Sequence, residues 1–374
     1  MKKSLIAAAA LCACAGAAQA QSSVTLYGVV DAPIEYVSNM PKAGGGSANL
    51  FRMASGGGLS GSRWGLRGTE DLGGGNQALF VLESGFGIDN GTSQQGNRLF
   101  GRQAFVGLNN NQFGKITLGR QYTTIFDVLA NFSPTGYATM WEPMVQQLGL
   151  NFRSDNTAKY TGTFGPVTAE GHWSFGNGAL GAGEAPGQFR RDSGYGLGAS
   201  YIAGPLGVGV AYDQYNPSLN GAGGATGTIR KAAVAASYSF GSAIKVMAGY
   251  RWGQAQAQAG LASAVSQYRD DYYWAGVNYQ ATAALGLTLG YSYDNLKSMA
   301  TSATTSVNPP NPWQVQLVAD YNLSKRTDVY VMGAYAKNAG LGLDNPTIAF
   351  ANGYQPATGK DSMVGVAVGL RHKF

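Results

Sequence analysis

The sequence has 374 residues, of which 12% are charged and 44% hydrophobic, and its formal net charge is +6. A soluble domain carries about a quarter of its residues as charged side chains, so this composition argues against an ordinary soluble protein. The basic residues are scattered along the chain, which argues against nucleic acid as a partner and against binding to an anionic membrane surface.

The first twenty residues predict a secretory signal peptide. Two lysines precede an apolar run at positions 5–18, and Ala18-Gln19-Ala20 is a small-x-small cleavage site. The apolar run is too short for a lasting transmembrane helix. We therefore expect residues 1–20 to be removed, which leaves residues 21–374 as one mature domain with a formal net charge of +4, two lysines fewer than the full sequence.

Both cysteines lie in the same segment, at Cys12 and Cys14. The mature domain is therefore expected to have no disulfide and no thiolate metal site. The run from Leu11 to Cys14 is also similar to a lipoprotein cleavage box. We favour the plain signal peptide, because a strand-like segment begins almost directly afterwards, at Ser23–Tyr27.

Period-two alternation recurs along the rest of the chain and predicts strands with one apolar and one polar face. Residues 63–69 place Trp64 and Leu66 on one face and two arginines on the other, and residues 285–294 and 364–374 alternate in the same way. Tyr273 and Tyr279 stand at the two ends of an apolar face, as the aromatic belts of a membrane barrel require. No segment after the leader has the roughly 18 consecutive apolar residues of a membrane helix, so a closed β-barrel is the predicted fold.

Two kinds of connector separate these strands. Short ones rich in turn residues are at 71–75, 110–114, 165–166, 204–205, 241–242, 282–284 and 323–326, and long ones are at 38–59, 88–97, 123–152, 177–192, 216–227, 255–268, 297–310 and 339–360. Short and long connectors alternate, as periplasmic turns and extracellular loops do in outer-membrane barrels. The count predicts an all-β, antiparallel transmembrane barrel of about sixteen strands, wide enough to enclose an aqueous channel.

Six stretches in chain order resemble the general porins of Gram-negative bacteria, most closely those of β-proteobacteria. They are Ser22–Gly28, Ser62–Gly73, Gly101–Leu108, Leu118–Tyr122, Leu323–Tyr330 and Val368–Phe374. The resemblance implies a homotrimer in the outer membrane through which ions and small hydrophilic solutes diffuse passively. It also implies that the third long loop, Thr123–Phe152, folds inward and narrows the channel.

The same resemblance implies where the constriction charges lie. Arg63, Arg102 and Arg153 match the basic side chains of the barrel wall, and Asp127 and Glu142 are the carboxylates of the third long loop. The surplus of the three arginines over the loop carboxylates predicts weak anion selectivity, because a narrow passage focuses the field of its fixed charges. If Asp127 and Glu142 both reach the arginines, the balance is nearly neutral and weak cation preference is the alternative.

Each of these residues also has a plainer interpretation. Arg63 could be an ordinary solvated residue of the channel wall, although an arginine on the lipid face would cost about 2 to 4 kcal/mol near the midplane. In the period-two alternation, Arg102 falls on the same face as apolar residues such as Val106. Its assignment to the channel side therefore rests on the resemblance and on Phe105 facing lipid. Arg153 could anchor the loop through Asp155.

The two loop carboxylates, Asp127 and Glu142, could likewise be ordinary solvated side chains. Arg120 has an outward parity and is left out of the predicted constriction. The resemblance further implies that Phe374, which ends an alternating strand, is read by the barrel-insertion machinery. Outer-membrane lipid and lipopolysaccharide are the other expected partners.

Two other classes of function compete with a general pore. A barrel enzyme needs a convergent set of catalytic side chains, but the two histidines, His172 and His372, have no serine, carboxylate or second histidine nearby in sequence. We therefore expect no enzymatic activity, no cofactor and no metal. A sugar-specific channel would have about eighteen strands and a ladder of aromatic residues along its interior, whereas the predicted inner faces carry mainly Gly, Thr, Ser, Asp and Arg.

Overall fold

The computed structural model describes residues 23–148, 152–179, 183–218, 223–257, 267–301, 305–345 and 353–374. The predicted signal peptide, residues 1–20, lies outside these ranges. Among the described residues, no helix combines the length and the hydropathy needed to cross a membrane.

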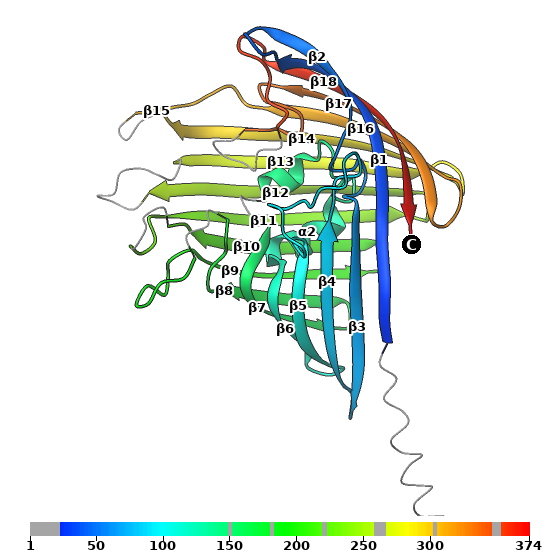
Figure 1. Ribbon diagram of the computed structural model, residues 1–374, viewed down its shortest axis with the longest axis vertical. Coiled ribbons are helices and arrows are strands. Elements are labelled where there is room, and N and C mark those ends of the chain that lie inside the picture. The colour runs from blue at the N-terminus through cyan, green and yellow to red at the C-terminus, as the bar shows by residue number, and fades with distance from the viewer. Residues whose placement is uncertain are drawn as a thin grey trace, which may run out of the picture.

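The strands form one antiparallel sheet that closes on itself, because β1 pairs with β3 along one edge and with β18 along the other (Figure 1). The strands are β1 (Ser23–Pro41), β2 (Ser47–Met53), β3 (Arg63–Gly73), β4 (Asn76–Gly85), β5 (Gln103–Asn110), β6 (Gly114–Tyr122), β7 (Arg153–Phe164), β8 (Val167–Ser174), β9 (Ser193–Ala203), β10 (Leu206–Asn216), β11 (Gly227–Phe240), β12 (Ile244–Ala257), β13 (Tyr268–Gln280), β14 (Leu285–Ala300), β15 (Ser306–Val307), β16 (Trp313–Asn322), β17 (Thr327–Lys337) and β18 (Ser362–Lys373). Three short helical segments, α2 (Thr124–Leu129), η2 (Ala130–Phe132) and α3 (Pro143–Gln147), lie between β6 and β7.

Sixteen of the strands make up the barrel, which confirms the predicted number. The other two, β2 and β15, lie inside the predicted connectors 38–59 and 297–310 and were not expected. β2 pairs with the second half of β1, and β15 pairs with the last two residues of β14. Neither is one of the sixteen strands that form the closed barrel.

The short turns lie where the sequence places them. β7 ends at Phe164 and β8 begins at Val167, so the turn is the predicted Gly165-Pro166 pair. Gly165 has a φ of 60°, a left-handed conformation that glycine adopts without a steric penalty. The long connectors gather at the opposite edge of the barrel, so the sheet has a turn edge and a loop edge.

The outer face of the barrel is apolar and exposed. Residues at alternate positions of β14 and β18 are exposed, among them Leu289, Tyr291, Val366 and Val368. Their neighbours in sequence, such as Ser292 and Ala367, are buried on the other face. An apolar band of this kind faces lipid in a transmembrane barrel, so the predicted alternation is confirmed.

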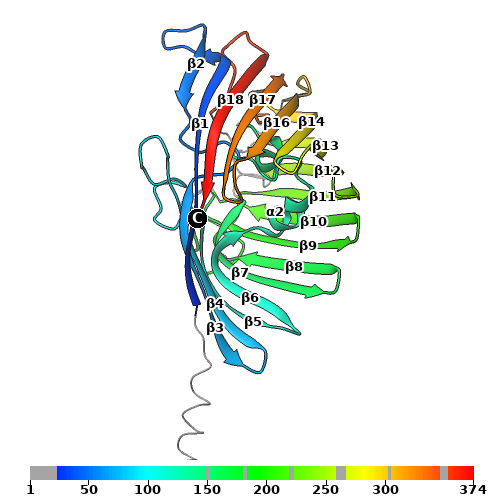
Figure 2. The ribbon, with the colours of Figure 1, turned by 90° about the vertical axis from the view of Figure 1, so that its right-hand side faces the viewer.

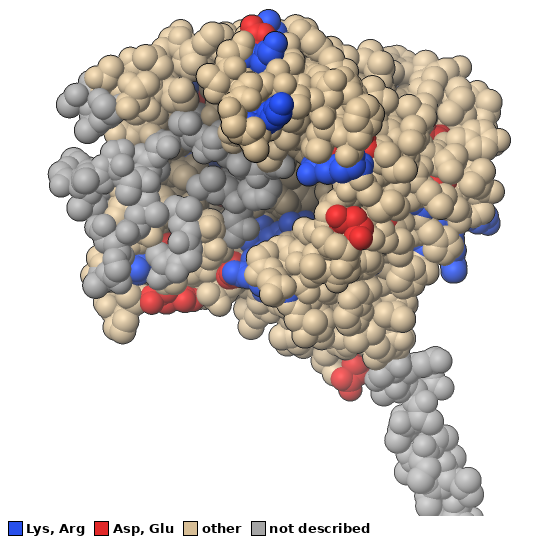
Figure 3. Space-filling view, turned by 45° about the horizontal axis from the view of Figure 1, so that its top comes forward, with Lys and Arg blue, Asp and Glu red and all other residues tan. Residues whose placement is uncertain are grey.

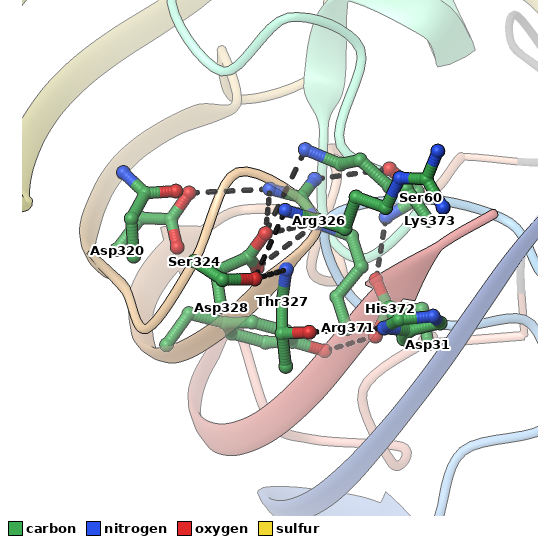
Figure 4. A network of polar contacts seen from close by, with 12 residues as sticks. Asp31, Ser60, Asp320, Ser324, Arg326, Thr327, Asp328, Arg371, His372 and Lys373 are labelled. Carbon is green, nitrogen blue, oxygen red and sulfur yellow. Dashed lines mark hydrogen bonds and ion pairs between the residues drawn. The ribbon is translucent and has the colours of Figure 1, made fainter.

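The closure of the barrel, where β18 lies beside β1 (Figure 2), is reinforced by a polar network, which we call the seam network (Figure 4). Arg371 of β18 donates to Asp328 of β17 (3.0 Å), Asp320 of β16 (3.2 Å) and Ser60 (3.0 Å). Asp31 of β1 accepts hydrogen bonds from the Ser60 backbone N–H and from the Tyr330 hydroxyl. The network therefore ties the first strand to the last three.

Candidate functional site

Glu83 gathers two of the predicted arginines on the face of the sheet opposite to the exposed apolar one. The Arg102 Nε lies 2.7 Å from Glu83 Oε1, and the Arg63 Nε lies 3.8 Å from Oε2. The Tyr27 hydroxyl also donates to Oε2 (3.1 Å). The pairing register of β4 with its two neighbouring strands explains why Arg63 and Arg102 both reach Glu83. Gly65 of β3 and Gln103 of β5 both lie opposite Glu83.

Arg102 lies on the inner face for a different reason from the one expected. The exposed residues of β5 are Val106 and Leu108, and Phe105 lies on the opposite face. The expectation that Phe105 faces lipid is therefore wrong. Arg102 directly precedes β5, so the parity of the strand does not fix its side chain.

Arg153 joins the same cluster through aromatic rings. Its guanidinium lies 5.2 Å from the centroid of the Tyr122 ring and 4.5 Å from that of Phe152, which are cation–π distances. Arg102 Nη2 donates to the Tyr122 hydroxyl (3.3 Å). The structure thus brings Arg63, Arg102 and Arg153 together around Glu83 and Tyr122, and we call this group the arginine cluster.

Asp155, the alternative partner suggested for Arg153, is engaged by other arginines. Arg120 Nη1 lies 2.6 Å from Asp155 Oδ1, and Arg98 Nη1 lies 2.8 Å from Oδ2. Arg120 lies opposite Ala104 in the ladder. Ala104 has the same parity as the exposed residues Val106 and Leu108, so this position belongs to the outer face. This agrees with the outward parity predicted for Arg120.

Asp127, on α2, pairs with a lysine that sequence reasoning missed. The ammonium of Lys159 on β7 donates to Asp127 and to the Tyr122 carbonyl (3.2 Å), and it lies 3.2 Å from Glu170. The exposed neighbour Tyr160 faces outward, so the period of two could have placed Lys159 on the inner face. Sequence spacing gives no sign of its pairing with Asp127.

Glu142 is not brought to the arginine cluster. Its carboxylate accepts hydrogen bonds from the hydroxyls of Ser133 (3.2 Å) and Thr135, within the same connector. Burial raises the pKa of Glu142 to about 7, and the hydrogen bonds from Thr135 and Ser133 oppose this rise. Burial therefore favours the neutral form of Glu142.

The connector between β6 and β7 is held by side chains of the barrel wall that donate to its backbone carbonyls. The bonds are Lys245 to Asn131 (2.8 Å), Trp274 to Phe132 (2.9 Å), Asn278 to Pro134 (2.7 Å), Gln316 to Met140 (3.3 Å), Gln314 to Trp141 (2.7 Å) and Lys231 to Gln147 (2.7 Å). Carbonyls without a partner are costly where water is excluded. These donors therefore stabilise an otherwise irregular backbone.

Apolar packing fixes the connector as well. The Phe126 ring stacks between Tyr122 and Phe152, with centroids 4.4 and 4.9 Å away. A Cβ at Gly209 of β10 would lie 2.5 Å from the Phe132 ring, so that position admits only glycine without displacement of the ring. Glycines of the wall thus make room for large side chains of the connector.

Among the side chains of the arginine cluster and the ion pairs of Glu83 and Lys159, basic groups outnumber acidic ones. Arg63, Arg102, Arg153 and Lys159 are the cations, and Glu83, Asp127 and Glu170 are the carboxylates that pair with them. Four cations against three carboxylates leave one positive charge in excess. Figure 3 shows Lys and Arg side chains along the border of a hollow, whereas most of that face carries neither charge.

Comparison with known proteins assigns the family. The sequence profile of the Gram-negative porins matches residues 7–341. An outer membrane porin of Bordetella pertussis is 34% identical and outer membrane porin protein 32 of Delftia acidovorans is 33% identical, each over 100% of both chains.

Solved structures agree with this assignment. The anion-selective porin from Comamonas acidovorans has a TM-score of 0.73 and 26% identity, over 95% of this chain and 100% of that one. The trimer form of OmpT from Vibrio cholerae has a TM-score of 0.66 over 94% of this chain and 99% of that one, and at 15% identity it shows the fold alone. The chain therefore belongs to the Gram-negative porin family, whose members are integral β-barrel proteins of the outer membrane.

Proposed function

We propose that this porin is a general diffusion channel for ions and small hydrophilic solutes, with weak anion selectivity. The connector Thr123–Phe152 narrows the passage, and the arginine cluster forms the basic side of the narrowest point. The observation that carries the proposal is the meeting of Arg63, Arg102 and Arg153 on the inner face beside that connector.

The expected selectivity is weak because the charges nearly balance. Fixed charges in a narrow, low-dielectric passage bias the entry of ions of opposite sign, but here the excess is a single positive charge. The related porin from Comamonas acidovorans is described as anion-selective, which supports the direction of the bias. The family and the fold are those of a channel, and the lack of enzymatic activity is part of the same proposal.

Conductance of the purified protein in a planar bilayer tests this function. We expect large, ohmic steps that tolerate different small solutes, and a reversal potential in a salt gradient that favours chloride over potassium. The preference should fade from 0.1 M to 1 M salt, because the Debye length falls from about 10 Å to about 3 Å. Strong cation selectivity, or saturable conductance of one solute, would contradict a general anion-preferring pore.

Assembly belongs to the proposal as well. We propose that residues 1–20 direct export and that the mature chain forms a homotrimer, as the trimer form reported for the Vibrio cholerae neighbour suggests. We also propose that the barrel-insertion machinery reads the aromatic side chain of Phe374. The backbone of Phe374 pairs with Gly28 through two hydrogen bonds of 3.0 Å, and its ring, on a residue that is 44% exposed, packs over Gly28.

This division between backbone and ring allows a sharp test. Phe374→Ala keeps both backbone hydrogen bonds to Gly28 and removes only the ring. We expect severalfold less folded barrel in the outer membrane, measured by heat-modifiable mobility, but unchanged refolding from urea into detergent, where no insertion machinery acts. Phe374→Tyr, which keeps a ring, is the matched control. Equal losses in cells and in detergent would show that the ring has only a structural role.

A further inference from the structure

The connector between β6 and β7 begins at a histidine of the barrel wall. His172 of β8 accepts a hydrogen bond at Nδ1 from the Thr124 backbone N–H (3.2 Å), and the Thr124 hydroxyl lies 2.9 Å from the same nitrogen. Thr124 is the first residue of α2, which packs against β8, β9 and β10 (Figure 2). The preceding residue, Thr123, makes no side-chain cap. His172 therefore takes the place of a helix N-cap and satisfies a backbone donor of the first turn.

This hydrogen bond assigns the position of the ring proton. A neutral imidazole has one donor nitrogen and one acceptor nitrogen. Because a backbone N–H can only donate, Nδ1 of His172 is the acceptor and the proton lies on Nε2. Nε2 is 3.8 Å from Asp213 Oδ2 of β10, a distance too long for a hydrogen bond. Among the described residues neither atom has a hydrogen-bond partner, so the carboxylate faces the Nε2 proton without competition from another donor.

The register of three neighbouring strands puts the ring in this position. Gly196 of β9 lies opposite His172 on one side and opposite Asp213 on the other. A Cβ on Gly196 would lie 2.7 Å from His172 Cε1 and 2.9 Å from Asp213 Oδ2. The absence of a side chain at Gly196 therefore leaves the space in which the imidazole and the carboxylate face each other.

A second wall side chain holds the same short stretch of backbone. Lys159 of β7 lies opposite His172 in the ladder and donates to the Tyr122 carbonyl (3.2 Å). The two wall residues thus bond the backbone on either side of Thr123, Lys159 at a carbonyl and His172 at an N–H. Together they fix the point at which the connector leaves the wall.

Thr124, His172 and Asp213 are residue types that also occur in hydrolytic triads, in which the hydroxyl attacks a bound substrate. Here Thr124 is fully buried and His172 is buried beneath α2. The Thr124 hydroxyl is therefore closed off from a solute in the channel. Burial leaves these side chains the task of holding the connector.

We propose that His172 is a positioning residue of the channel, whose Nδ1 fixes the first turn of the connector through the Thr124 N–H. The inference rests on the proposed function, in which this connector narrows the passage. A buried donor that loses its acceptor is costly, so removal of the imidazole nitrogen should loosen the first turn of α2. The width of the passage should then fluctuate.

Nitrogen NMR tests the assignment without any measurement of conductance. The sequence has two histidines, so untagged protein labelled with ¹⁵N-histidine and carrying His372→Gln reports on His172 alone. We expect one protonated and one unprotonated ring nitrogen at neutral pH, with the proton on Nε2. A ring protonated on Nδ1, or on both nitrogens, would overturn the proposal because Nδ1 could not accept from Thr124.

Two substitutions at His172 test its effect on the connector. His172→Leu fills a similar volume without an acceptor, whereas His172→Asn keeps an acceptor oxygen close to the position of Nδ1. Backbone amides of residues 124–128 should exchange with deuterium at least about tenfold faster in His172→Leu, because the first turn opens more often. Exchange in His172→Asn should stay close to that of the unmodified protein. The open-channel current noise should rise severalfold in His172→Leu only.

The other histidine supplies the matched control. The ring of His372 also lies close to a threonine hydroxyl, that of Thr327 (2.9 Å), but at the turn edge of the barrel. His372→Leu should therefore change neither the exchange of residues 124–128 nor the noise. Equal exchange in His172→Leu and His172→Asn would overturn the positioning role. Faster exchange in His172→Leu with unchanged noise would support that role and would count against the connector as the narrowest point. If His172→Leu does not fold, the NMR assignment in the His372→Gln protein decides.

Discussion

Replacement of residues 124–151 by a short glycine and serine linker should raise the single-channel conductance severalfold. The connector places a cluster of buried apolar side chains against the inner wall, among them Ile125, Leu129, Phe132 and Met144. Its loss leaves the hydrogen-bonded ladder of the sixteen barrel strands intact, so the barrel should still close. The space that the connector occupied then becomes available to water and ions. Planar-bilayer recordings measure the change.

A matched control comes from another long connector. Residues 89–93, between β4 and β5, are exposed, and their deletion should leave the conductance unchanged. Folding of both variants is verified by heat-modifiable mobility and by β-sheet circular dichroism. A folded deletion of residues 124–151 with unchanged conductance would show that this connector does not set the width of the passage.

Loss of the arginine cluster should reverse the ion preference of the channel. Arg63→Gln leaves three cations against the three carboxylates Glu83, Asp127 and Glu170, so the anion preference should nearly vanish. The triple variant with glutamine at Arg63, Arg102 and Arg153 leaves one cation against three carboxylates and should prefer cations severalfold. Reversal potentials across a salt gradient report both changes.

Two features of the experiment keep the interpretation clear. Lys360→Gln removes an exposed charge from a long connector and should leave selectivity unchanged, because solvent screens a charge outside the passage. The triple variant also leaves Glu83 without its two arginine partners, so Arg63→Gln is the variant that disturbs packing least. Unchanged selectivity in Arg63→Gln would mean that the narrowest point lies elsewhere.

The strands and turns could be predicted from the sequence because the information is local. Alternation at residues 364–370 and the Gly165-Pro166 turn depend on neighbours in the chain, and both are present in the structure. β2 was missed, because Ser47–Met53 is mostly exposed and pairs only with an extension of β1. Its residues therefore need not alternate between an apolar and a polar face.

The charged site was harder to predict, since parity gives a face but not a partner. Parity places Arg63 on the inner face, but its meeting with Arg102 depends on the register of β3, β4 and β5. The pairing of Asp127 with Lys159 joins residues 32 positions apart. Glu142 is satisfied inside its own connector, which no property of its neighbours in sequence reveals.

The pairing of β1 with β18 also determines when the barrel can finish folding. Asp31 and Tyr330 of the seam network are 299 residues apart, and Asn39 and Ser362, which also bond across the closure, are 323 apart. Hairpins of neighbouring strands form within microseconds, whereas contacts over such separations form slowly. Until β18 arrives, the unfinished sheet exposes two open edges that can pair with other chains. Transit through the periplasm therefore requires these edges to be shielded. Once β1 and β18 pair, the closed barrel has no open edge through which it can aggregate with other chains.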